Sequence, residues 1–119
     1  RCDLLVFLTP VTFGGYSSEL KKAVDRFACS MLLPFFTTID GEVHHKARYE
    51  PLPGLIGIGV LPHQDEESER IFAKLVEKNA VNLHSPASQS AVFYSSQDPE
   101  LIEKGVRSLL ANSKKARRN

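Results

Sequence analysis

The residues of this sequence that are best placed to bind a ligand form a glycine-rich loop between an apolar run and a helix-forming segment. Gly14 and Gly15 have no side chains, so the backbone there can take positive φ and approach a flat molecule closely. Val11, Thr12 and Phe13 can present backbone N–H groups, and the N-terminus of the following helix adds partial positive charge. Such a loop suits the edge of a heteroaromatic ring with carbonyl and ring-nitrogen acceptors, against which Phe13 can pack. The alternative is a turn that only connects a strand to a helix.

Four histidines are the other candidates for chemistry, at positions 44, 45, 63 and 84. His44 and His45 are adjacent, and adjacent residues of a strand point to opposite faces, so the two rarely share an ion. No H-x-x-x-H or Cys/His spacing is present, and we therefore predict no metal site. His63 follows a predicted strand, where it can serve as a proton donor or hydrogen-bond partner to a bound ring. The alternative for His63 is an exposed loop histidine without such a role.

Alternating strands and helices position the loop. The apolar run 4–8 is continuous, as in a parallel strand that is covered on both faces, and we expect it to end at Pro10. Ser17 or Ser18 caps a helix that runs to about Met31. Two further strands are predicted at 55–61 and 91–95, followed by helices at 65–82 and 98–111. This order predicts right-handed crossovers and a parallel sheet, with the loop at the carboxyl ends of the strands, where ligands bind.

A β-hairpin interrupts this alternation. Asp40-Gly41 lies between two β-prone runs, which is a strong hairpin signal, and we predict strands at 35–39 and 42–49. We interpret residues 35–49 as an insertion into the alternating pattern. Residues 112–119 are predicted to form a frayed basic tail. We interpret this tail as solvated and not as a nucleic-acid patch, because no aromatic residue accompanies its charges.

Size and charge bound the remaining possibilities. The 119 residues are predicted to form a single domain, and a net charge of +1 favours neither nucleic acid nor a membrane as a partner. No apolar run approaches the ~20 residues that span a bilayer. Cys2 and Cys29 are too few for a disulfide framework, so we predict reduced thiols and a cytoplasmic location. The sequence opens at Arg1 without an initiator Met, which we interpret as a fragment, a processed product or a shortened expression product.

The segment that carries the loop resembles a known family over residues 3–27. Thr9-Pro10-Val11-Thr12-Phe13-Gly14-Gly15, then Ser18, Leu20-Lys21 and Asp25-Arg26, resemble the isoalloxazine-binding loop and following helix of flavodoxin-like NAD(P)H-dependent FMN reductases. The resemblance implies an α/β, flavodoxin-like, three-layer parallel sheet with helices on both faces. That sheet is incomplete here. Three parallel strands and the hairpin insertion are predicted, whereas the family's first strand and phosphate-binding loop have no counterpart in the sequence.

The same resemblance implies a function: an FMN-dependent NAD(P)H oxidoreductase of the flavin or quinone/small-molecule reductase type. FMN would be the cofactor, NAD(P)H the co-substrate, and the protein a homo-oligomer. The segment 44–49 would belong to an elaboration that covers the flavin or meets a partner subunit. No catalytic residue is assigned, and the implied cofactor-binding residues are Thr9, Pro10, Val11, Thr12, Phe13, Gly14, Gly15, Ser18 and His63.

A second function is also compatible with the sequence. Without a phosphate-binding loop, the chain can be a non-catalytic flavodoxin-like module for oligomerisation or interaction that binds no cofactor. The first predicted strand favours this alternative, because another chain can pair with an exposed strand edge.

Overall fold

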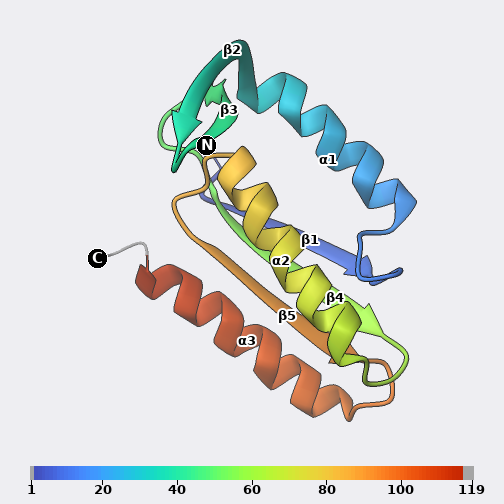
Figure 1. The fold of residues 1–119 in the computed structure, drawn as a ribbon. Helices are drawn as coiled ribbons and strands as arrows, with labels where there is room; N and C mark the ends of the chain where they lie inside the picture. The colour runs from blue at the N-terminus through green and yellow to red at the C-terminus, as the bar shows by residue number, and fades with distance from the viewer. Residues whose placement is uncertain (1, 117–119) are drawn as a thin grey trace.

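The described part of the chain is an α/β structure built from a parallel sheet, a separate hairpin and three helices (Figure 1). The computed structural model describes residues 2–116. The elements, in chain order, are β1 (Leu4–Pro10), α1 (Ser18–Met31), β2 (Leu32–Ile39), β3 (Glu42–Ala47), β4 (Gly54–Leu61), α2 (Glu66–Asn82), β5 (Ser88–Tyr94) and α3 (Pro99–Ala116). This architecture is consistent with an incomplete flavodoxin-like fold, and the predicted fold class is confirmed.

The three-stranded sheet has the order β1-β4-β5, and both strand pairs are parallel. β1 pairs with β4 from Leu4↔Gly54 to Pro10↔Val60, and β4 pairs with β5 from Leu55↔Ser88 to Leu61↔Tyr94. The carboxyl ends of the strands therefore meet at one edge of the sheet. The glycine-rich loop between β1 and α1 starts at this edge.

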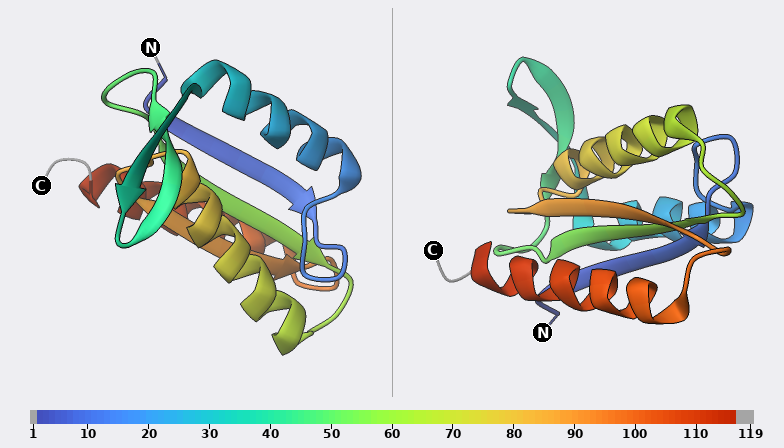
Figure 2. Two further views of the ribbon diagram at one scale, coloured as in Figure 1. Left: turned by 45° about the horizontal axis from the view of Figure 1, so that its top comes forward. Right: turned by 90° about the horizontal axis from the view of Figure 1, so that it is seen from below.

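The helices cover both faces of the sheet, with α2 and α3 on opposite sides (Figure 2). Phe7 of β1, Val24 of α1 and Phe72 of α2 belong to one buried cluster, so α1 and α2 pack on the same face. On the other face, Phe93 of β5 packs against α3 at Gly105. The serine N-cap predicted for α1 is Ser17, whose hydroxyl accepts from the Leu20 N–H at 3.2 Å.

One side of β1 is left uncovered by the described residues. Val6 and Leu8 pair in register with Ile56 and Ile58 of β4 and so share their face of the sheet. The two isoleucines are buried, whereas Leu8 is 68% exposed and Val6 is also exposed. Because α3 covers the centre of this face and not its edge, the apolar surface of β1 stays open to solvent.

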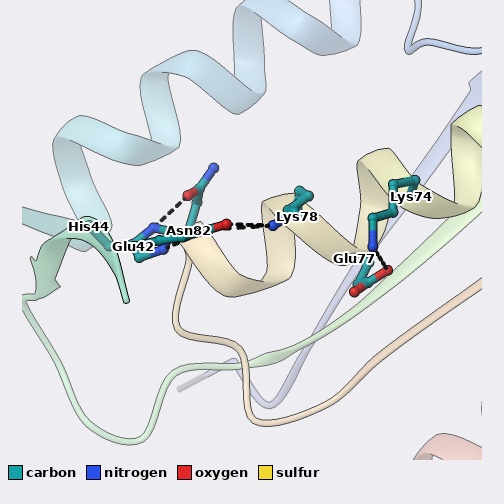
Figure 3. Close-up of polar contacts among 6 residues, drawn as sticks. All are labelled: Glu42, His44, Lys74, Glu77, Lys78 and Asn82. Carbon is teal, nitrogen blue, oxygen red and sulfur yellow. Dashed lines mark hydrogen bonds and ion pairs between the residues drawn. The ribbon is translucent and has the colours of Figure 1, made fainter. Parts of the chain in front are cut away.

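The β2–β3 hairpin projects away from the sheet at the C-terminal end of α2 (Figures 1 and 2). Polar contacts fasten it there (Figure 3). Lys78 donates to Glu42 at 3.0 Å, and His44 Nδ1 lies 2.9 Å from the side-chain oxygen of Asn82. The Glu42 carboxylate is also 3.4 Å from the buried Nε2 of His44. The hairpin is antiparallel and turns at Asp40-Gly41, as predicted, although its strands cover different residues from the predicted ranges.

Several element boundaries differ from prediction. β1 does end at Pro10, as predicted, and Pro10 itself belongs to the strand, because an edge strand can accept a residue without an N–H group. β5 begins at Ser88 and not at residue 91. α3 continues to Ala116, so residues 112–116 of the predicted frayed tail are helical, and Ser113 is buried with its hydroxyl bonded to the Leu110 carbonyl. Residues 117–119 of that tail lie outside the described residues.

Candidate functional site

The glycine-rich loop closes as a tight two-residue turn. The Thr12 N–H donates to the Gly15 carbonyl at 3.0 Å, and the Gly15 N–H donates to the Thr12 carbonyl at 2.8 Å. The two central residues, Phe13 and Gly14, have φ values of 50° and 78°. Reciprocal bonding around two residues with positive φ is the pattern of a type I′ turn. The turn presents Phe13 and Gly14 at its tip.

The turn uses some of the backbone donors that we expected a ligand to use. The Val11 N–H donates to the Val60 carbonyl of β4 at 2.9 Å, and the Thr12 N–H bonds within the turn. The expectation that these two N–H groups are available to a ligand was therefore wrong, because one bonds to β4 and the other closes the turn. The N–H groups of Phe13 and Gly14 have no hydrogen-bond partner among residues 2–116.

Phe13 is the most unusual residue of the loop. Its side chain is 98% exposed, and its backbone lies in the left-handed region. An aromatic side chain in this region is strained, and such residues cluster at functional sites. Exposure also costs the apolar ring the burial that ordinarily stabilises it. The side chain of Phe13 therefore adds nothing to the core, and its left-handed backbone is an energetic cost of the turn.

The residues around the turn hold it rigidly. The buried hydroxyl of Thr9 donates to the Pro10 carbonyl at 2.7 Å and accepts from the Ser17 N–H at 2.9 Å, so it ties the end of β1 to the start of α1. Tyr16 is buried, with edge-on ring contacts to Phe7 and Phe72 at centroid distances of 5.7 and 5.9 Å.

Gly14 contacts α2 directly. A Cβ at this position would lie 2.5 Å from Cγ2 of Ile71, a distance that requires the neighbouring atoms to move. Ile71 itself is 38% exposed. Only a glycine lets the turn lie this close to α2, and sequence reasoning did not identify Ile71 as part of the loop's support.

The remaining predicted site residues have different surroundings. Ser18 is the exposed first residue of α1, beyond the capping Ser17. Val11 is buried against Gly59 of β4, so its side chain faces the protein interior. Pro10 at the end of β1 and Thr12 in the turn are exposed, and Gly15 is partly buried.

The neighbouring strand ends bring titratable groups to the same edge of the sheet. His63 is exposed, two residues before Asp65, which caps α2. Hydrogen bonds from the Ser68 backbone and hydroxyl hold the pKa of Asp65 below its ordinary value, and the nearby His63 contributes slightly. At the end of β5, the hydroxyl of Tyr94 donates to Glu69, and this bond raises the pKa of Tyr94. Sequence reasoning missed the pairing of Tyr94 and Glu69, which lie 25 residues apart.

Four cavities of the described chain are lined by residues that lie outside the glycine-rich loop. Across residues 2–116, no group of three or more His, Cys, Asp or Glu side chains is arranged to hold a metal ion. Nor does any helix within that range have the length and apolar character needed to cross a membrane.

Comparison with known proteins adds no relative to these observations. The chain matches no protein-family model, and comparisons with curated proteins and with solved structures also give no match. The case for a function therefore rests on the residues of this chain.

Proposed function

We propose that the turn between β1 and α1 holds the isoalloxazine ring of FMN, and that the chain supplies this side of an FMN-dependent NAD(P)H oxidoreductase. The observation that carries the proposal is Phe13, a fully exposed aromatic residue in a strained conformation at the carboxyl edge of a parallel sheet. Ligands of open α/β sheets bind at this edge.

The groups at the turn fit the ring of a flavin. The free N–H groups of Phe13 and Gly14 can donate to carbonyl and ring-nitrogen acceptors. The Phe13 ring can pack against the plane or edge of the isoalloxazine. Pro10, Thr12, Gly15, Ser18 and His63 remain predicted contacts; the side chains of Thr9 and Val11 support the turn from within.

The fit does not extend to the phosphate of FMN. The three loops at this edge, residues 9–18, 61–65 and 95–98, contain no lysine or arginine. Ring recognition without an ion pair to the phosphate is therefore the part of flavin binding that this chain can provide. Bound FMN would supply two-electron transfer from a nicotinamide to an acceptor, and the turn would orient the ring. NAD(P)H chemistry and the unpaired thiols of Cys2 and Cys29 favour a cytoplasmic location.

Titration of the full chain with FMN and with riboflavin, followed by flavin fluorescence, tests the proposal. Riboflavin differs from FMN by lacking the phosphate. Because the loops of this chain have no lysine or arginine to pair with that phosphate, we expect the two dissociation constants to agree within about threefold. Phe13→Ala should weaken both by about tenfold, since it removes the aromatic contact. Phe35→Ala is the matched control, because Phe35 is also an exposed phenylalanine but lies on the hairpin. Absence of binding by either flavin, or equal affinities for the two variants, would contradict the proposal.

A second function, a module for self-association without a cofactor, is favoured by the open edge of β1. Val6 and Leu8 expose an apolar face beside a strand with no second pairing partner among the described residues. Exposed strand edges of this kind pair with other chains. A homo-oligomer assembled through β1 would cover this face.

Sedimentation velocity over a range of protein concentrations tests this second function. Leu8→Lys should shift the protein to the monomer, because it places a charge on the open face of β1. Val43→Lys is the control, since Val43 is also 68% exposed but lies on the hairpin. A parent chain that is monomeric at every concentration would exclude the module, whatever the flavin titration shows.

A further inference from the structure

A second candidate binding site lies at the opposite end of the sheet from the glycine-rich loop. A cavity of about 580 Å³ is formed between the base of the hairpin and the segments that lead into β4 and β5. Its apolar surface comes from Pro51, Leu52 and Pro86, and its polar groups from Tyr49, Glu50 and His84. A volume of this size, with apolar walls and a few convergent polar groups, is typical of small-molecule sites.

The polar groups of the cavity favour a ligand that donates hydrogen bonds. His84 Nε2 lies 2.5 Å from the backbone carbonyl of His45. Since a carbonyl only accepts, we assign the proton of the neutral ring to Nε2, which leaves Nδ1 as an acceptor. The Glu50 carboxylate has neither a salt bridge nor a hydrogen bond within the described chain, and it also only accepts.

The end of α2 adds further negative character. α2 ends at Asn82, and His84 follows two residues later, so the cavity lies beside the C-terminus of the helix. The C-terminal end of a helix carries partial negative charge and attracts cations, although the carbonyls of Asn79, Ala80 and Val81 here already accept from the N–H groups of Leu83, Ser85 and His84. The last turn of α2 contains no basic residue to compensate this charge. The Glu50 carboxylate adds a full negative charge to the same cavity.

His84 also has a strained backbone. Its φ of 51° lies in the left-handed region, which is uncommon for a residue other than glycine. Its own N–H bonds to the Val81 carbonyl at 3.0 Å, and the following Ser85 N–H bonds to the Ala80 carbonyl at 2.9 Å. These contacts hold the strained residue against the cavity. They form a Schellman cap, so the left-handed conformation of His84 ends α2 and fixes this residue beside the cavity.

We propose that this cavity binds a small organic cation: a primary ammonium or guanidinium head on a compact apolar body. The head contacts the Glu50 carboxylate, near the C-terminal end of α2. The body packs on Leu52 and the proline rings, and the Tyr49 ring offers its face to the charge. This site is independent of the glycine-rich loop.

Benzylamine, which is charged at neutral pH, is the probe, and benzyl alcohol is its neutral counterpart of similar shape. Each is titrated into the ¹⁵N-labelled full chain, and the backbone amide signals are followed by NMR. Benzylamine should shift the signals of Glu50, Leu52 and His84 and should bind about fivefold more tightly than benzyl alcohol. Glu50→Gln should remove most of that difference and weaken benzylamine by about fivefold. Tyr49→Leu should weaken it by about threefold, through loss of the aromatic face.

Glu67→Gln is the matched control, because Glu67 is an exposed carboxylate in the first turn of α2, far along the helix from the cavity. It should leave benzylamine affinity unchanged. Equal binding of benzylamine and benzyl alcohol would overturn the recognition of a cation. Signal shifts confined to residues away from the cavity, or no shifts at all, would overturn the site. Circular dichroism of each variant confirms that the fold is retained.

Discussion

The turns at Phe13-Gly14 and Asp40-Gly41 share one backbone geometry and differ in everything around it. In both, the two central residues have positive φ, with values of 50° and 78° in the first and 49° and 81° in the second. The hairpin turn uses Asp40, a residue type that tolerates the left-handed region, and a Cβ at Gly41 would meet nothing within 4 Å. The loop turn instead places a phenylalanine in the strained position and presses its glycine against α2.

The difference separates a turn formed by local preference from a turn imposed by its surroundings. Asp-Gly forms its turn wherever two strands flank it, so the hairpin needs little help from the rest of the chain. Phe-Gly is held by Thr9, Tyr16 and Ile71, from three different elements or loops. Support of this extent around a locally unfavourable residue is expected where that residue has a role beyond folding.

Replacing the glycine of each turn by alanine should produce the largest contrast. Gly14→Ala combines a left-handed alanine with a Cβ 2.5 Å from Ile71, so we expect a loss of about 3 kcal/mol in the free energy of unfolding. Gly41→Ala should lower the free energy of unfolding by only about 1 kcal/mol, the cost of a left-handed alanine without a clash. Urea denaturation of both variants measures the difference. Equal losses would mean that Ile71 moves away freely and that α2 does not constrain the loop.

Because the buried Tyr16 anchors the loop turn, the stability of the protein should also depend on pH in the alkaline range. Burial raises the pKa of Tyr16 to about 12, against the lowering effect of its hydrogen bond from Asn79. The neutral phenol is therefore favoured in the folded state. Its contribution to stability is complete below the ordinary tyrosine pKa and is lost as the pH rises from about 10 to 12, up to about 2 kcal/mol.

Comparison with Tyr16→Phe isolates this effect, because the variant keeps the ring packing and removes the ionisation. The stability of the parent should fall toward that of the variant, or below it, across the same pH range. Tyr49→Phe, near the base of the hairpin, is the control and should retain the parent's pH dependence. A parent and a Tyr16→Phe variant with parallel pH profiles would show that the Tyr16 hydroxyl ionises as freely as in the unfolded chain.

Asparagine at the first position of each turn should show which one stores strain. Phe13→Asn replaces a strained, exposed aromatic residue by one that tolerates positive φ, and we expect the free energy of unfolding to rise by about 1 kcal/mol while flavin binding weakens. Asp40→Asn should change stability by less than about 0.3 kcal/mol. Thermal unfolding and the flavin titration are measured on the same samples. Loss of stability in Phe13→Asn would show that the Phe13 ring packs against the protein in solution.

The sequence predicts those features of the two turns that depend on near neighbours. Asp40-Gly41 is enough to place the hairpin, and the serines before Glu19 are enough to place the start of α1, because each signal acts within a few residues. The state of the loop donors depends on Val60, which lies about fifty residues away, and the need for Gly14 depends on Ile71. No local pattern contains these relations.

The same limit applies to the rest of the fold. The length of α3 depended on a place for Ser113 in the interior. The cavity at the base of the hairpin brings Glu50 and His84 together from two separate segments. Each of these features requires the packed structure.

The smallest expected effect concerns the contact that fastens the hairpin turn. A hydrogen bond from Lys78, followed by the charge of its ammonium group, holds the pKa of Glu42 below its ordinary value (Figure 3). This contribution to stability is present above the ordinary glutamate pKa and is lost as the pH falls through the lowered value. Lys78→Met should raise the pKa of Glu42 toward that ordinary value, measured by NMR titration of the carboxyl carbon. Because both side chains are about half exposed, the melting temperature should hardly change.

Lys74→Met is the matched control for Lys78→Met. Lys74 pairs with Glu77 at 3.0 Å on the same helix, one turn earlier, and this pair lies apart from the hairpin (Figure 3). The pKa of Glu42 should be the same in Lys74→Met as in the parent. If Lys78→Met also leaves it unchanged, the ion pair does not form in solution, and the histidine contacts, His44 to Asn82 and His84 to the His45 carbonyl, hold the hairpin. With either set of contacts, residues outside the hairpin hold it in place, whereas the Asp40-Gly41 turn itself forms from local preference.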